Sequence, residues 1–110
     1  MEKNKEIKKV AEIAKKVGFK VSFDTDVETN DVIIDFSTNG YTFYIEVSPD
    51  ADAREISDQL YMFVEDFDTD VVPELEEDYD QVDIDEIKEK VYDLFREHLA
   101  LRNKRMGLVD

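Results

Sequence analysis

Acidic side chains are concentrated in one stretch, residues 65–86, which holds twelve Asp and Glu residues and no Lys or Arg. Four of these acids have the spacing of calcium ligands at positions 1, 3, 5 and 12 of an EF-hand loop: Asp66, Asp68, Asp70 and Glu77. The sixth position of such a loop needs a glycine for its sharp turn, but Val71 stands there, and a β-branched residue resists positive φ. We therefore expect no specific metal site and no cofactor, and only weak screening of the acids by cations.

Few other residues could perform chemistry. The chain has no cysteine, which excludes disulfides, thiolate metal sites and a cysteine nucleophile, and its one histidine is His98. His98 falls on the apolar stripe of the last predicted helix, so we expect a core residue rather than a general base. Nucleophile-elbow, P-loop and dinucleotide motifs are absent, and three glycines cannot build a Gly-rich loop. We expect no catalytic residues and no enzymatic activity, because no carboxylate pair stands out as a candidate with shifted pKa values.

The composition describes one folded domain. The chain has 110 residues, of which 42% are hydrophobic and 11% aromatic, which is too apolar for a disordered acidic tail. We expect a single domain over residues 1–110, with residues 103–110 as a frayed end. No apolar run approaches the ~20 residues of a membrane span. Residues 1–9 are polar and do not resemble a secretion signal. We therefore expect a cytoplasmic protein that does not bind membranes.

The net charge of −15 is unevenly distributed along the chain. Residues 1–20 carry +4, residues 21–87 carry −21 with Arg54 as their single cation, and residues 88–110 carry +2. Such an acidic field repels nucleic acid and anionic lipid, so direct nucleic-acid binding is not expected. The acids could serve solubility alone, but that role would mix the two signs. We favour imitation of the phosphate spacing of DNA, which would steer a basic nucleic-acid-binding surface onto the protein.

Apolar residues that recur three and four positions apart predict three amphipathic helices, at about residues 4–17, 52–67 and 84–102. The last helix is expected to open with Asp83, because Glu86 three residues later completes a capping box. Val82 and Ile87 would form the accompanying hydrophobic staple. Before this helix, residues 68–81 are expected to form an acidic connection with one helical turn that begins at Pro73.

Alternating apolar residues predict three strands, at residues 19–24, 32–37 and 41–47. Asn39-Gly40 lies between the second and third strands, and this dipeptide favours a two-residue hairpin turn because both residues tolerate positive φ. That turn pairs Phe36 with Phe43 and places the apolar side chains of both strands on one face. The sequence therefore predicts an α+β fold of order α-β-β-β-α-α, with the helices packed on one face of an antiparallel sheet.

This order of elements, the small size and the acidic stretch resemble the phage-encoded anti-CRISPR proteins that inhibit RNA-guided nucleases by mimicking DNA. The stretches that carry the resemblance are residues 32–36, Asn39-Gly40, residues 44–47 and the acids of residues 65–86. The resemblance implies that acidic side chains occupy the Arg and Lys positions that normally read DNA. The helix at 3–17 and the basic last helix depart from that pattern. Residues 61–70 are also similar to a stretch in small proteins of gut-bacterial prophages and conjugative elements.

We therefore predict an acidic, non-enzymatic protein-binding module that acts as a DNA mimic on a basic protein surface, such as that of a nuclease. Nine acids are the expected contacts: Glu65, Asp66, Asp68, Asp70, Glu74, Glu76, Glu77, Asp78 and Asp80. The alternative is an adaptor, since the first half of the chain is similar to secretion-chaperone-like domains. In that case Ile33 and Tyr44, on the polar face of the sheet, and the helix at 52–67 would form the contacts.

Overall fold

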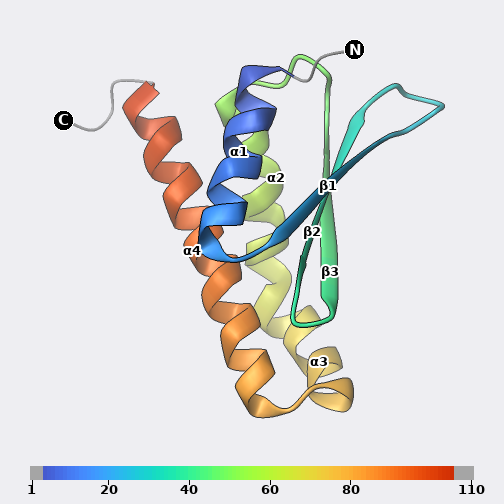
Figure 1. Ribbon diagram of the computed structural model, residues 1–110, viewed down its shortest axis with the longest axis vertical. Helices are drawn as coiled ribbons and strands as arrows, with labels where there is room; N and C mark the ends of the chain where they lie inside the picture. Colours follow the sequence, from blue (N-terminus) through green and yellow to red (C-terminus); the bar gives the residue numbers. More distant parts are fainter. Residues whose placement is uncertain (1–3, 106–110) are drawn as a thin grey trace.

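The protein is described by a computed structural model over residues 4–105 (Figure 1). Its elements are α1 (Lys5–Val17), β1 (Lys20–Thr25), β2 (Val32–Thr38), β3 (Tyr41–Val47), α2 (Ala53–Asp66), the π-helical turn η1 (Phe67–Val71), α3 (Val72–Asp78) and α4 (Gln81–Arg105). The predicted α+β class and the order α-β-β-β-α-α are confirmed, with η1 and α3 inserted before the last helix. Residues 106–110, which belong to the end expected to fray, lie outside the described residues, and residues 103–105 are helical.

The three strands form one antiparallel sheet in the order β1-β2-β3. The predicted register of the second hairpin is confirmed, with Phe36 opposite Phe43 and a turn at Asn39 (φ 53°) and Gly40 (φ 82°). The first strand begins one residue later than predicted. The amide of Phe19 donates to the carbonyl oxygen of Ala14 (2.9 Å), so its backbone still belongs to the end of α1.

Helices α1, α2 and α4 lie on one side of the sheet (Figure 1), and the core fills the space between them and the sheet. Phe43 is the centre of an aromatic cluster, with ring centroids 5.0 Å from Phe36 and 4.1 Å from Phe63. Ile34 and Phe36 from the sheet are fully buried, as is Ile87 from α4. Burial of this apolar face, at roughly 25 cal/mol per Å² of apolar surface, holds the helices on the sheet.

The acidic connection predicted at 68–81 is more helical than expected, because η1 and α3 extend the single turn predicted at Pro73 over residues 67–78. Phe67 in η1 and Leu75 in α3 are buried and draw the segment onto the core. Pro73 lies in the first turn of α3, where its missing N–H breaks no helical hydrogen bond. The amide of Val72 donates to the carbonyl oxygen of Phe67, which closes the wide π-helical turn between α2 and α3.

The last helix begins at Gln81, so the predicted opening at Asp83 is wrong. Asp80 caps the helix instead, because its Oδ1 accepts from the amide of Asp83 at 2.9 Å. Val82 is 69% exposed, which excludes the predicted hydrophobic staple. The helix also continues beyond the predicted end at 102, through Arg105.

Candidate functional site

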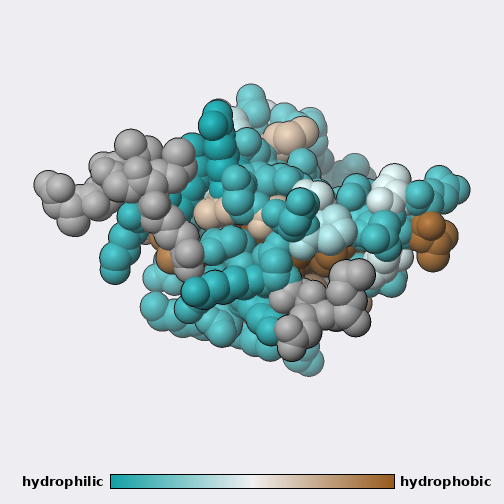
Figure 2. All heavy atoms as spheres, turned by 90° about the horizontal axis from the view of Figure 1, so that it is seen from above, coloured by the Kyte–Doolittle hydropathy of each residue, from teal (hydrophilic) through white to brown (hydrophobic). Residues whose placement is uncertain are grey.

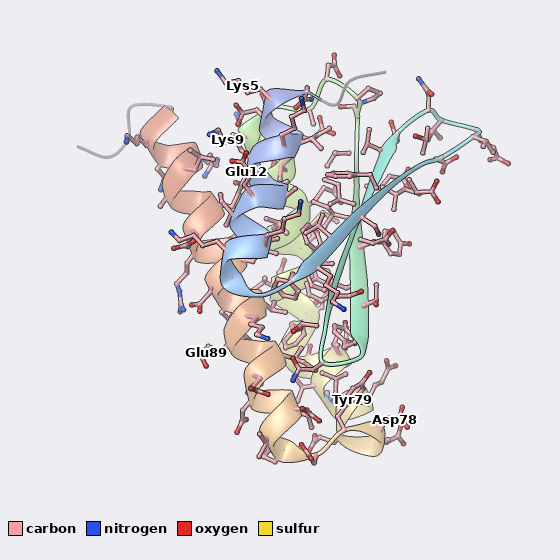
Figure 3. All side chains as sticks on the ribbon, viewed as in Figure 1. Lys5, Lys9, Glu12, Asp78, Tyr79 and Glu89 are labelled. Atoms are coloured by element: carbon pink, nitrogen blue, oxygen red, sulfur yellow. The ribbon has the colours of Figure 1, made fainter. Side chains whose placement is uncertain are left out.

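The nine acids predicted to bind a partner are all exposed, and they follow one another through the end of α2, η1, α3 and the residue that caps α4. We call this surface the acidic end. In Figure 3 Asp78 marks it at the bottom of the molecule, whereas Lys5 and Lys9 of α1 lie at the top. The acidic end therefore lies at the end of the molecule opposite to these two lysines. The face seen from above is mainly hydrophilic (Figure 2).

The acidic end has its shape because a few apolar side chains turn inward. Leu75 is buried in α3, and Val71 and Val72 are half-buried before it. The residues between and after these positions consequently face solvent. A helix rises about 1.5 Å per residue, so nine acids over residues 65–80 present roughly one charge per 2.7 Å, which is sparser than the roughly one per 1.7 Å of DNA.

Two lysines follow the acidic stretch in α4, and both have partners within the protein. The Nζ of Lys88 lies 3.9 Å from Oδ1 of Asp68, and both side chains are well exposed, so the pair contributes little to stability. The Nζ of Lys90 donates to Oγ1 of Thr38 (2.8 Å), away from the nine acids. Within residues 4–105, the pair of Lys88 with Asp68 is the one ion pair to these nine acids, so most of their charge has no basic partner in this part of the chain.

The hairpin turn is anchored to the start of α4. Nδ2 of Asn39 donates to Oδ1 of Asp83 (3.0 Å) and to Oε2 of Glu86 (2.9 Å). The hydroxyl of Tyr79 donates to the carbonyl oxygen of Gly40 at 2.8 Å. These bonds fix the position of the acidic end relative to the sheet. Asp83 and Glu86 therefore have a structural role as anchors of the hairpin turn.

Two tyrosines report the electrostatic environment of this region. Partial burial raises the pKa of Tyr92 to about 12, and the carboxylate of Asp68, which accepts a hydrogen bond from its hydroxyl, adds to the shift. Burial likewise raises the pKa of Tyr41 to about 12, with further contributions from Glu74 and Tyr79. Both tyrosines are neutral at pH 7, where they can donate hydrogen bonds.

The EF-hand spacing does not produce a loop. Asp66 ends α2, Asp68 and Asp70 lie in η1, and Glu77 lies in α3. Within residues 4–105, no group of three His, Asp or Glu side chains is arranged to hold a metal ion. The helical conformation directs these four carboxylates outward along a surface rather than inward around a common point.

The surface predicted for the adaptor alternative contains both apolar and acidic side chains, unlike the acidic end. Tyr44 is 61% exposed on the open face of the sheet, while Ile33 is half-buried. At the end of this face near the β1–β2 loop, desolvation raises the pKa of Glu46, and the neighbouring carboxylates of Asp26 and Asp31 raise it further. This face therefore combines one exposed aromatic ring with a group of acids.

His98 is fully buried, as expected for a core histidine, and shares a 3.0 Å hydrogen bond with Ser57 through its Nδ1. Beside this pair lies a feature that sequence reasoning missed, a pocket of about 300 Å³ between α2 and α4. The only sequence signal was Tyr61, which stands beside the apolar stripe of its helix and is 52% exposed. No helix in the described part of the chain is both long enough and apolar enough to span a membrane.

Comparisons with known proteins return no relatives. No protein-family model matches the chain, and no curated protein or solved structure matches it with significant similarity.

Proposed function

We propose that the protein is a non-enzymatic module whose acidic end binds a basic surface on a partner protein, as a mimic of DNA. The observation that supports this proposal is the exposure of all nine acids at one end of the fold, in a stretch without Lys or Arg. A partner that binds nucleic acid presents Lys and Arg side chains in a groove. The field of the acidic end would attract that groove and compete with phosphate.

The partner class follows from the same chemistry. A nuclease or another nucleic-acid enzyme has the required basic groove, and inhibition of such an enzyme is the corresponding activity. The resemblance to anti-CRISPR proteins favours a phage or mobile-element origin and a cytoplasmic setting.

The test is competition with DNA on purified nucleic-acid enzymes, including an RNA-guided nuclease and a restriction enzyme. The protein should displace a labelled DNA duplex from one of them, and its apparent affinity should fall steeply between ~50 and ~200 mM salt. The contradicting result is partner binding that does not respond to salt or that leaves DNA bound.

A matched pair of triple variants assigns the effect to the acidic end. One variant removes three negative charges from this surface by the substitutions Asp70→Asn, Glu76→Gln and Glu77→Gln. The control variant replaces the same residue types elsewhere, by Asp50→Asn, Glu12→Gln and Glu28→Gln. The net charge of both variants is then less negative by three. Only the first variant should lose the ability to displace DNA. An equal loss in both variants would mean that the net charge alone explains the effect.

The second candidate is an adaptor that docks apolar groups, and the exposure of Tyr44 (61%) and Met62 (60%) favours it. Binding through these side chains would barely respond to salt, because apolar contacts are not screened. Tyr44→Ala and Met62→Ala would then abolish partner binding, whereas the triple variant of the acidic end would retain it.

A further inference from the structure

The pocket between α2 and α4 is built from the middle of α2 and the second half of α4. Its lining residues are Ser57, Asp58, Tyr61, Phe95, Leu99 and Arg102. None of them belongs to the acidic end. An inference about this pocket is therefore independent of the function proposed above.

Side-chain size explains why the two helices leave space here. Ser57 is a buried lining residue, and its small side chain is held by its hydrogen bond to buried His98. The rings of Tyr61 and Phe95 face each other at a centroid distance of 5.9 Å and a tilt of 40°. A small polar residue flanked by aromatic rings leaves a recess with mostly apolar walls.

Arg102 contributes a positively charged guanidinium group to this pocket. Its Nε atom is buried and has no hydrogen-bond acceptor among residues 4–105. No carboxylate of the described residues lies within 4.0 Å of its guanidinium. Guanidinium stays charged at all relevant pH values, and a buried donor without an acceptor is costly. Because Arg102 lines the pocket, the ligand group that suits it best is a carboxylate, whose two oxygens match the guanidinium fork.

We propose that this pocket binds a small monocarboxylic acid with an aromatic or branched apolar body. The carboxylate would accept hydrogen bonds from Arg102, and the body would lie against Tyr61, Phe95 and Leu99. The exposed carboxylate of Asp58 at the same pocket disfavours a second negative charge on the ligand. A volume of about 300 Å³ is at the lower limit of ligand pockets, which restricts the ligand to a small molecule or one terminal residue of a peptide.

Calorimetric titration of the full chain with 3-phenylpropanoate tests the proposal. The acid should bind saturably, and the neutral isostere 3-phenylpropanamide should bind at least about tenfold more weakly, since it cannot form a charge-assisted pair. Phenylsuccinate, with its second carboxylate, should also bind more weakly than the monoacid. An acetylated tripeptide that ends in Phe with a free carboxylate carries the same chemistry. Its affinity relative to the small acid identifies the source of the ligand.

Variants assign the binding to the pocket. Arg102→Gln should weaken binding of 3-phenylpropanoate at least about tenfold, the effect of losing one charged hydrogen-bond partner. Arg96→Gln is the matched control, because Arg96 is exposed on the same helix, pairs with Asp93 and does not line the pocket. It should leave the affinity unchanged.

Tyr61→Ala removes part of the apolar wall at a half-exposed position, so it should weaken binding while circular dichroism shows an intact fold. The proposal is overturned by the absence of saturable binding of either carboxylate. It is also overturned by equal affinity for acid and amide, or by Arg102→Gln and Arg96→Gln variants that bind alike.

Discussion

Ser57 and His98, which are separated by 41 residues in the sequence, share a 3.0 Å hydrogen bond in the interior between α2 and α4. Ser57 is 2% exposed and His98 is fully buried. This buried polar pair joins the two helices, and its Ser57 also lines the pocket. Because a hydrogen bond is directional, this one fixes the relative position of α2 and α4 more narrowly than apolar contacts alone would.

Ser57→Ala should therefore destabilise the protein by about 1–3 kcal/mol, because it takes a hydrogen-bond partner from a buried histidine. The measurement is chemical denaturation followed by circular dichroism. Ser22→Ala, at an exposed position of β1, is the control and should change the free energy of unfolding by no more than about 0.5 kcal/mol. Equal effects of both substitutions would mean that the buried hydrogen bond contributes nothing.

Asn39→Asp tests the anchoring of the hairpin turn. Asp also tolerates positive φ, but it replaces the amide donor with a carboxylate that faces Asp83 and Glu86. We expect a loss of about 1–3 kcal/mol at pH 7 that shrinks as the pH falls toward ~4, where carboxylates take up protons.

The control for this substitution is Asn30→Asp, since Asn30 also has positive φ (67°) but lies in the exposed loop between β1 and β2. It should cost less stability than Asn39→Asp. A pH-independent loss at position 39 would assign the effect to the turn itself rather than to repulsion by α4.

Gly18→Ala should destabilise the junction of α1 and β1 by about 1–3 kcal/mol. Gly18 has a φ of 124°, which side-chain-bearing residues rarely adopt, and an added Cβ would lie 3.0 Å from Cε of Lys90. Combining this change with Lys90→Ala in thermal denaturation separates the two causes. If the two losses simply add, backbone strain explains the effect; if the double variant is more stable than the sum, the contact contributes.

The tyrosines predict a loss of stability at alkaline pH. The pKa values of Tyr41 and Tyr92 are raised to about 12, from an ordinary value of 10.0. The folded state therefore keeps protons that the unfolded state releases between pH 10 and 12. The stability that comes from these two neutral tyrosines is complete below pH 10 and is lost as the pH rises through this window.

Ultraviolet absorbance of tyrosinate measures this directly. Two of the five tyrosines should ionise only near pH 12 while the protein is folded. Tyr92→Phe should remove one of these two late ionisation steps. Asp68→Asn should lower the pH midpoint of Tyr92 ionisation, because it removes the nearby negative charge. Ionisation of Tyr41 and Tyr92 around pH 10 in the folded protein would contradict the assignment.

The sequence by itself determined the second hairpin and the general architecture. The alternation around Asn39-Gly40 fixes which residues face each other, because a shift by one position would expose the whole apolar face. Gly18 likewise ends α1 through a backbone property of its own. The exposure of the nine acids also follows from their type, since charged side chains are rarely buried.

Only the tertiary structure decided the rest. Asp80 and Asp83 are both good caps by type, and the hydrogen bonds of Asn39 to α4 occupy Asp83 and leave the capping role to Asp80. The helical form of α3 depends on the burial of Leu75 against distant elements. The pocket depends on Tyr61 and Arg102, from helices whose contact no local pattern records. Local geometry follows from neighbouring residues, whereas caps, buried anchors and pockets depend on groups that only folding brings together.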